Sequence, residues 1–344
     1  QGDDELGPKN ANDAHPSYVF GTKPLLPHFT TGINLQKKQF PRTGLSMMPV
    51  LFTIPGLDHP VYTYGLLMGM GFFSIWFLAP RLAARTGNDP RVLSMAVLIA
   101  VVPFLIGARL FVFWANPHLP RTLHAFLDIR SGGIAAYGGF AGALLAAYPY
   151  CRAKGSNPWR LVDAAAPFLV LALGMVRIGC FASGCCFGKP TESALGVRFP
   201  PGSVAFEEHL RLGLAEPGAS GTLPLHPVQL YEAGFDWLLA GILLWLHRRR
   251  ELELKGGTLQ GRPRREGDGK DGRIFWILAA AYAGGRFLLE YVRDDPLRGT
   301  VLGVFTQGQL VGLILIGLAA FMIFHRLPRH PHRSRARTSV PGDP

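Results

Sequence analysis

Charged residues are scarce in this sequence: they make up 17% of its 344 residues, whereas 48% are hydrophobic. The apolar residues gather in long runs rather than in amphipathic patterns. This scarcity argues against an ordinary soluble domain and places the chain among membrane proteins. The start of the chain also lacks a basic segment followed by a short apolar one, so no signal peptide is visible and we expect a processed or truncated N-terminus.

Seven apolar stretches reach or approach the ~20 residues that a membrane-crossing helix needs. They cover residues 61–80, 92–114, 134–150, 163–179, 229–246, 274–292 and 306–325. The sequence therefore predicts an all-α integral membrane protein with seven transmembrane helices. The third stretch is rich in glycine and alanine, which let helix backbones approach closely, so we expect it in the packed interior rather than against lipid.

Lysine and arginine are concentrated in four segments, which hold 20 of the 35 basic residues: 81–91, 152–160, 247–273 and the tail from 326. The intervening loops 115–133, 180–228 and 293–305 carry only two, three and two. Because basic loops remain on the cytoplasmic side, this alternation predicts an external N-terminus and a cytoplasmic C-terminus. Topology thus accounts for most of the net charge of +12, and we expect no nucleic-acid partner.

Composition divides the chain into three parts. Residues 1–58 show no helical or strand period, which predicts a poorly ordered external extension. Residues 59–326 form the seven-span membrane domain, and residues 327–344 form a basic cytoplasmic tail.

Four charged residues inside predicted spans stand out, because a charged residue at membrane depth costs at least ~2.5–3.5 kcal/mol on insertion scales. They are Arg109, Arg177, Arg286 and Glu290. Tyr282, Arg286 and Glu290 are spaced four apart and therefore share one helix face. This face indicates either an internal Arg–Glu ion pair that fixes packing or a functional site.

Arg177 has no carboxylate three or four residues away, so its partner must come from elsewhere. Its planar guanidinium suits two-point contact with phosphate oxygens. The alternatives are contact with lipid headgroups or pairing with Glu232 or Glu290. Six residues lie on the outer halves of their spans or in adjoining loops, and we expect them to share one polar pocket that opens outward: Arg177, His226, Glu232, Tyr282, Arg286 and Glu290.

Cysteine is rare, with only four in the chain, yet Cys180, Cys185 and Cys186 lie within seven residues. An external location permits a disulfide from Cys180 to either neighbour. A zinc site is a second alternative, with His226 as the nearest candidate for a fourth ligand. A third is an active site lined by thiols, in which Arg177 would increase the thiolate fraction.

Five motifs occur in order: Tyr64-Gly65, YGGFAGAL, GMVRIGCFASGCCFGKPT, HPVQLYEA and GRFLLEYVRDDPLRG. Over about residues 55–325 the chain resembles the prolipoprotein diacylglyceryl transferase family. The resemblance implies an enzyme of the bacterial inner membrane that moves diacylglyceryl from phosphatidylglycerol to the lipobox cysteine of preprolipoproteins. Its expected partners are phosphatidylglycerol, preprolipoprotein signal peptides and membrane lipids, and the resemblance implies no cofactor and no metal.

The resemblance also implies roles for individual residues. Arg177 matches the family's phosphatidylglycerol-binding arginine, Arg286 an arginine that holds the phosphate, Glu290 a supporting carboxylate and Gly188 a functional glycine. Tyr64 and Tyr282 match important tyrosines. The predicted catalytic residues are Tyr64, Tyr137, His226, Tyr282 and Glu290, and the predicted substrate-binding residues are Arg177, Cys180, Gly188, Arg286 and Arg293.

Three positions depart from the family pattern. Tyr137 stands where the family has histidine before Gly-Gly, Cys180 where it has asparagine, and Cys185 where it has glutamate. Because a tyrosine has an ordinary pKa of ~10, His226 is the alternative general base. The departures leave two other functions open: a membrane thiol-redox or metal-binding protein that uses Cys180, Cys185 and Cys186, and a non-catalytic lipid-binding paralogue.

Overall fold

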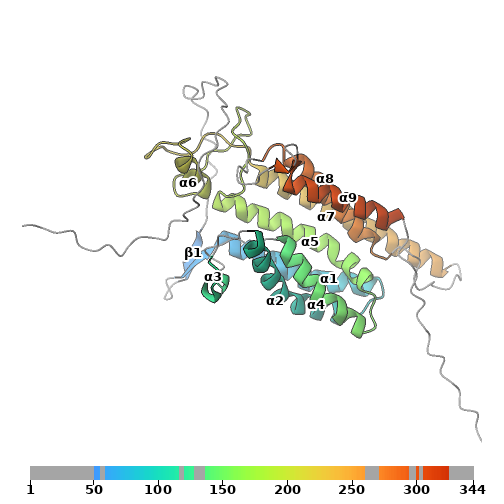
Figure 1. Ribbon diagram of the computed structural model, residues 1–344. Coiled ribbons are helices and arrows are strands. Elements are labelled where there is room, and N and C mark those ends of the chain that lie inside the picture. Colours follow the sequence, from blue (N-terminus) through green and yellow to red (C-terminus); the bar gives the residue numbers. More distant parts are fainter. Residues whose placement is uncertain are drawn as a thin grey trace, which may run out of the picture. The chain divides into compact units, whose positions relative to one another are not determined.

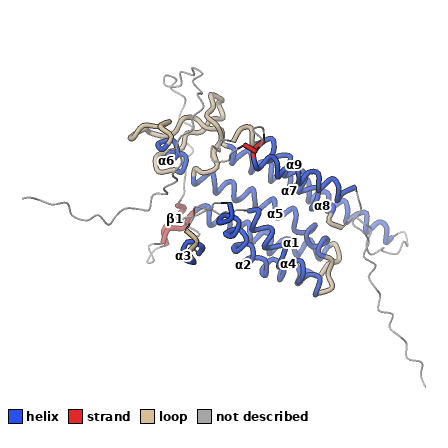
Figure 2. Tube along the Cα trace, viewed as in Figure 1, coloured by secondary structure: helices blue, strands red, loops and turns tan. Residues whose placement is uncertain are grey.

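The computed structural model describes residues 50–54, 59–115, 120–127, 136–259, 271–293, 300–301 and 305–324, and helices dominate these ranges (Figures 1 and 2). The long helices are α1 (Thr63–Arg85), α2 (Pro90–Ala115), α4 (Ala136–Ala153), α5 (Pro158–Ser183), α7 (Val228–Leu259), α8 (Arg273–Leu289) and α9 (Gln307–Phe324). Each of the seven apolar stretches predicted from the sequence overlaps one of these helices.

Three of these helices, α1, α2 and α5, are long and apolar enough to cross a membrane, and Gly308–Phe324 is a shorter apolar helix. Large apolar side chains are exposed along the helices, among them Val102 at 61%, Leu145 at 78% and Ile314 at 62%. Such surfaces suit lipid rather than water. The predicted class, a helical integral membrane protein, is thereby supported.

Short elements flank the long helices. They are α3 (Leu123–Leu127), α6 (Val204–Arg211), β1 (Val50–Ile54), β2 (His59–Tyr62), β3 (Thr300–Val301) and β4 (Phe305–Thr306). Strands β1 and β2 pair antiparallel, as do β3 and β4. Strand β1 falls within residues 1–58, where the sequence shows no strand period, and its order comes from backbone pairing with β2. Residues 1–49, 55–58 and the predicted tail 327–344 lie outside the described ranges.

Helix α5 lies between two groups of helices, with α1, α2 and α4 on one side and α7, α8 and α9 on the other (Figure 1). On the first side, Ala164 and Leu161 belong to one buried cluster with Ala79 and Ala83 of α1. On the second, Ala166 and Val170 join Leu243 of α7 and Leu278 of α8. Alanine dominates the first side because small side chains let helices approach closely.

Helices α2 and α4 approach each other through glycine. A Cβ added at Gly107 or Gly138 would overlap the backbone of the other residue, and one at Gly142 would overlap Pro103. The close approach expected for this stretch is therefore present. The expectation of an interior position is wrong, because α4 also exposes Leu144 and Leu145 at 56% and 78%.

Both ends of α5 are fixed by its own sequence. At its start, the Asn157 side chain accepts a hydrogen bond from the backbone N–H of Trp159, and Pro158 occupies the first turn. At its end, Gly184 adopts the left-handed conformation with φ 68°, and its N–H donates to the carbonyl of Phe181. These ends determine where the last turns of α5 present Arg177 and Cys180.

Candidate functional site

A buried carboxylate near the start of α7 collects three arginines. Glu232 is 4% exposed. Its carboxylate lies 2.7 Å from Arg177 Nε of α5, 2.7 Å from Arg286 Nη1 of α8 and 3.4 Å from Arg293 Nη1. We name Arg177, Glu232, Arg286, Glu290 and Arg293 the arginine cluster.

A second carboxylate supports this cluster from α8. Arg286 Nη2 lies 2.8 Å from Glu290 Oε2, four residues along the same helix. Thr306 donates its hydroxyl to Glu290 Oε1 at 3.2 Å, which ties the start of α9 to the pair. The predicted internal ion pair between Arg286 and Glu290 is thus confirmed.

Arg177 pairs with a carboxylate of the protein, which is one of the alternatives considered from the sequence. Its partner is Glu232, 55 positions along the chain, rather than an anion from outside the protein. Buried arginine retains its charge, and a fork-shaped guanidinium can exchange one pair of oxygens for another. The pairing therefore leaves Arg177 suited to an anionic ligand that displaces or shares Glu232.

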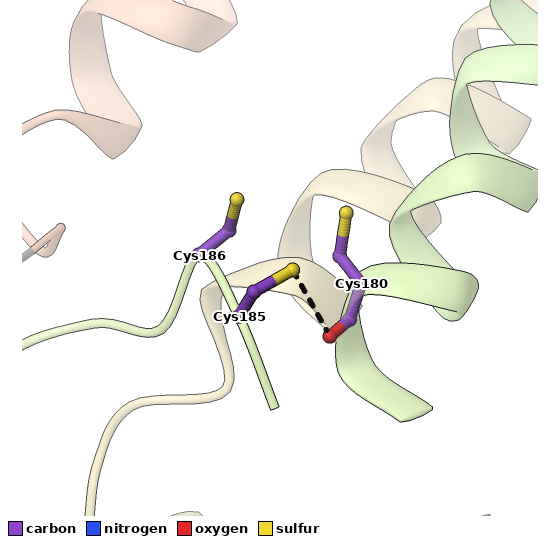
Figure 3. Close-up of side chains that lie close together, drawn as sticks. All are labelled: Cys180, Cys185 and Cys186. Carbon is purple, nitrogen blue, oxygen red and sulfur yellow. Dashed lines mark hydrogen bonds between the residues drawn. The ribbon is translucent and has the colours of Figure 1, made fainter. Parts of the chain in front are cut away.

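Three cysteines lie at the end of α5 and in the loop that follows it (Figure 3). Their Sγ atoms all lie within 4.8 Å of one another, and all four cysteines of the chain are free thiols. Cys185 donates its thiol to the carbonyl of Cys180 at 3.6 Å. Hydrogen bonds from Cys180 and Cys185, together with the charges of Arg293 and Arg177, lower the pKa of the Cys186 thiol below its usual range. The disulfide that the sequence left open as one alternative is not formed among these cysteines.

Two of the three predicted tyrosines lie beside these groups. Tyr64, at the start of α1, packs against Gly179 and interacts electrostatically with Cys180 and Arg177. Tyr282, on α8, interacts electrostatically with Arg177 and Glu232. Tyr137 belongs to α4, and its side chain lies outside the described residues.

Gly188, two residues after Cys186, lies at a tight junction where its backbone contacts two other segments of the chain. Its N–H donates to the carbonyl of His226 at 2.9 Å, and it forms an antiparallel bridge with Arg293. A Cβ on Gly188 would lie 2.5 Å from Val228 Cγ2 and 2.8 Å from the Val292 carbonyl oxygen. Gly188 therefore acts through close packing that holds Arg293 next to the cluster.

His226 lies at this junction, where its carbonyl accepts the hydrogen bond from the Gly188 N–H. Within the described part of the chain, its Nδ1 lies 3.4 Å from the hydroxyl of Tyr231. Of the six residues expected to share one polar pocket, four are joined by ion pairs, namely Arg177, Glu232, Arg286 and Glu290, and Tyr282 lies next to Arg177. That they form one pocket open to the outside remains a prediction. The role of His226 as a base also remains a prediction.

The chain that builds this site also matches a known family model. Residues 49–325 match the model described as prolipoprotein diacylglyceryl transferase. The chain belongs to the prolipoprotein diacylglyceryl transferase family. Among similar proteins, the phosphatidylglycerol–prolipoprotein diacylglyceryl transferase of Clostridium tetani is 31% identical over 280 residues, which cover 80% of this chain and 98% of that protein.

Two further relatives are similar to the same extent. Phosphatidylglycerol–prolipoprotein diacylglyceryl transferase 2 of Clostridium perfringens is 30% identical, with 79% of this chain and 93% of that protein covered. The corresponding protein of Chloroflexus aggregans is 30% identical, with 81% and 90% covered. The family match therefore extends over all seven long helices.

Sequence reasoning underestimated two residues of this transferase-family site. Glu232 was expected in the pocket but was not assigned a role, although it is the shared partner of three arginines. Gln229, fully buried, donates Nε2 to the carbonyl of Cys185 at 2.6 Å and so holds the cysteine loop. The available signal was the density of polar residues in HPVQLYE at the start of an apolar run.

Two other buried charged residues make structural contacts outside the arginine cluster. Arg109 donates Nε to the Phe126 carbonyl at 3.0 Å and Nη2 to the Ala125 carbonyl, so it anchors α3. Asp163, near the start of α5, accepts from Arg250 Nη1 and from the Gly272 and Phe275 N–H groups, each at 2.9 Å. Fourteen residues of α5 separate Asp163 from Arg177, so this second polar cluster lies toward the opposite end of that helix.

Proposed function

We propose that this protein transfers the diacylglyceryl group of phosphatidylglycerol to the lipobox cysteine thiol of a preprolipoprotein in the bacterial inner membrane. The family match and the names of the relatives support the transferase activity. The observation that carries the proposal for this chain is the convergence of Arg177, Arg286 and Arg293 on one buried carboxylate.

The lipid phosphate binds at the arginine cluster. A phosphodiester carries one negative charge and two free oxygens, which match the donor forks of Arg177 and Arg286. Glu232 holds the three guanidiniums in position before the lipid arrives, and Glu290 retains Arg286 when the lipid binds. Positioned cations of this kind cost little reorganisation during the reaction.

The reaction is a displacement at carbon. The acceptor sulfur attacks the glyceryl carbon that bears the phosphate ester, the C–S bond forms as the C–O bond breaks, and the electron pair leaves on glycerol phosphate. The arginines offset the charge that develops on the departing phosphate. The thiol proton passes to a base, for which His226 and Tyr137 are the candidates. Tyr64 and Tyr282 border the path of the substrate.

The helices α1, α2, α4, α5, α7, α8 and α9 act as seven transmembrane spans. The four basic segments assign the N-terminus to the outside and the C-terminus to the cytoplasm. We propose that, with this topology, the arginine cluster at the end of α5 and the start of α7 faces the periplasmic side, where the signal peptide of a preprolipoprotein presents its lipobox cysteine.

The test uses the full chain in nanodiscs that contain phosphatidylglycerol and a lipobox peptide. We expect a thioether-linked diacylglyceryl peptide, and we expect Arg177→Ala and Arg286→Ala each to reduce its rate at least tenfold. Arg211→Ala is the matched control, because Arg211 lies on α6 with its side chain 54% exposed and pairs with Glu208. Absence of product from the unaltered chain, or equal rates for Arg177→Ala and Arg211→Ala, would contradict the proposal.

A non-catalytic lipid-binding paralogue is the second candidate, favoured by Tyr137 and Cys180 at positions where the family has histidine and asparagine. Complementation of a bacterial strain that lacks its own transferase separates the two. Growth with the unaltered chain but not with Arg177→Ala supports the enzyme. Failure to complement, together with retained phosphatidylglycerol binding, supports the paralogue.

A further inference from the structure

The cysteine triad, Cys180, Cys185 and Cys186, is a concentration of thiols that diacylglyceryl transfer does not require. The triad uses three of the four cysteines in the chain. Their Sγ atoms lie within 4.8 Å of one another although Cys180 belongs to α5 and the other two to the loop. Figure 3 shows the Cys185 side chain directed toward the Cys180 carbonyl, with Cys186 beside Cys185.

Backbone conformation produces this convergence. Gly184 reverses the chain in the left-handed region at φ 68°, and Cys185 N–H then donates to the Cys180 carbonyl at 3.1 Å. Cys186 is itself left-handed at φ 60°, the one non-glycine residue with positive φ in the described ranges. A side chain rarely adopts this conformation unless its surroundings hold it there.

The surroundings of the loop do hold it. Gln229 donates to the Cys185 carbonyl at 2.6 Å from the start of α7. Gly188 and Lys189 donate to the carbonyls of His226 and Val292, each at 2.9 Å. The three sulfurs are therefore preorganised by contacts from α7 and from the segment that follows α8.

The spacing suits a thiolate-bound metal ion. Tetrahedral zinc with Zn–S of about 2.3 Å places sulfurs about 3.8 Å apart, so the sulfurs need to approach by no more than about 1 Å. A disulfide would use only two of the three sulfurs and leave the third as a free thiol. Arg177 and Arg293 interact electrostatically with the triad, and their charges stabilise thiolate ligands.

We propose that Cys180, Cys185 and Cys186 bind one thiophilic metal ion, zinc(II) or copper(I), as a structural site at the end of α5. Within the described residues the triad has no fourth histidine, cysteine or carboxylate close enough to complete a tetrahedron. Copper(I) is satisfied by three sulfurs, whereas zinc(II) takes a water or another exogenous ligand in addition. Binding releases the three thiol protons to solvent and transfers no electrons.

This site differs from the zinc alternative derived from the sequence. His226 is not its fourth ligand, because the ring contacts Tyr231 instead. The metal would fix the position of Cys180 and hence the last turn of α5, three residues beyond Arg177. The proposal stands independently of diacylglyceryl transfer, and its test measures metal rather than activity.

The experiment uses the full chain, produced without a histidine tag and purified in detergent with a non-thiol reductant. After treatment with a chelator, the protein is titrated with zinc(II) and, separately, with copper(I), each against a competing chromophoric chelator. We expect one equivalent of one of these ions to bind. X-ray absorption of that loaded protein should show three sulfur neighbours, with one further oxygen or nitrogen only if the ion is zinc.

Substitutions locate the site. Cys180→Ser, Cys185→Ser and Cys186→Ser should each weaken binding at least tenfold. Cys151→Ser is the matched control, because Cys151 of α4, at 4% exposure, is as buried as Cys180, at 5%, but packs in a separate cluster with residues of α1, α2 and α5. The X-ray absorption measurement on the unaltered chain requires no variant to fold.

Three results would overturn the proposal. The first is a metal shell with fewer than three sulfurs. The second is binding that Cys186→Ser leaves unchanged, which would identify an adventitious ion only. The third is a disulfide within the triad in protein alkylated directly in intact cells, because a disulfide would consume two of the ligands.

Discussion

Removal of the shared carboxylate tests the arginine cluster most directly. Glu232→Gln preserves the size of the side chain but deletes the negative charge that three arginines contact. Arg286 keeps Glu290 at 2.8 Å, whereas Arg177 loses the carboxylate at 2.7 Å. Because Glu232 is 4% exposed, water cannot replace the lost charge, and breaking a buried pair of this kind costs about 3–5 kcal/mol. We expect the free energy of unfolding to fall by that amount.

The assay is equilibrium unfolding in mixed micelles, followed by tryptophan fluorescence as the fraction of denaturing detergent increases. Glu208→Gln is the matched control, since Glu208 pairs with Arg211 at 2.5 Å on the exposed surface of α6 and such pairs contribute about 0–1 kcal/mol. Phosphatidylglycerol should reduce the deficit of Glu232→Gln because its headgroup carries a net negative charge, whereas zwitterionic phosphatidylcholine, which has the same phosphodiester but no net charge, should not. A loss no larger than that of Glu208→Gln would refute the central role of Glu232.

Three further substitutions have defined outcomes. Gly188→Ala should destabilise the protein by about 1–3 kcal/mol through overlap with Val228 and Val292, measured by the same unfolding assay, whereas Gly234→Ala, with nothing within 4 Å of the added Cβ, should not destabilise it. Asp163→Asn should lower the free energy of unfolding by about 3–5 kcal/mol, because Asp163 is 1% exposed and pairs with Arg250; a change below 1 kcal/mol would contradict this role. Arg109→Gln should increase hydrogen exchange in residues 122–127 by releasing the carbonyls of Ala125 and Phe126, and unchanged exchange there would show that α3 is held by other contacts.

The seven long helices were predictable because each is encoded locally. A run of about twenty apolar residues specifies a helix in lipid regardless of its neighbours. The same is true of the Arg286–Glu290 pair, since a spacing of four places both side chains on one face of α8. These features require no knowledge of how the helices pack.

The contacts of Arg177 and of the cysteines were not predictable in the same way. The pairing of Arg177 with Glu232 depends on how α5 lies against α7, and the sequence offered several carboxylates as partners. The convergence of the three sulfurs depends on left-handed backbone at Gly184 and Cys186, and only the first of these residues is a glycine. Strand β1 was missed for a similar reason, because its order comes from pairing with β2 rather than from its own pattern.

Asp163 anchors the start of α5 to α7 and α8, and this contact influences the position of residues farther along the helix. Asp163 and Arg177 are fourteen residues apart on it, or about 21 Å along the helix axis. A tilt of roughly 3° about Asp163 would displace Arg177 by about 1 Å, enough to disturb the alignment of reacting atoms. Substitutions of the residues that bind Asp163 should therefore change the rate of lipid turnover, although none of these residues contacts the lipid.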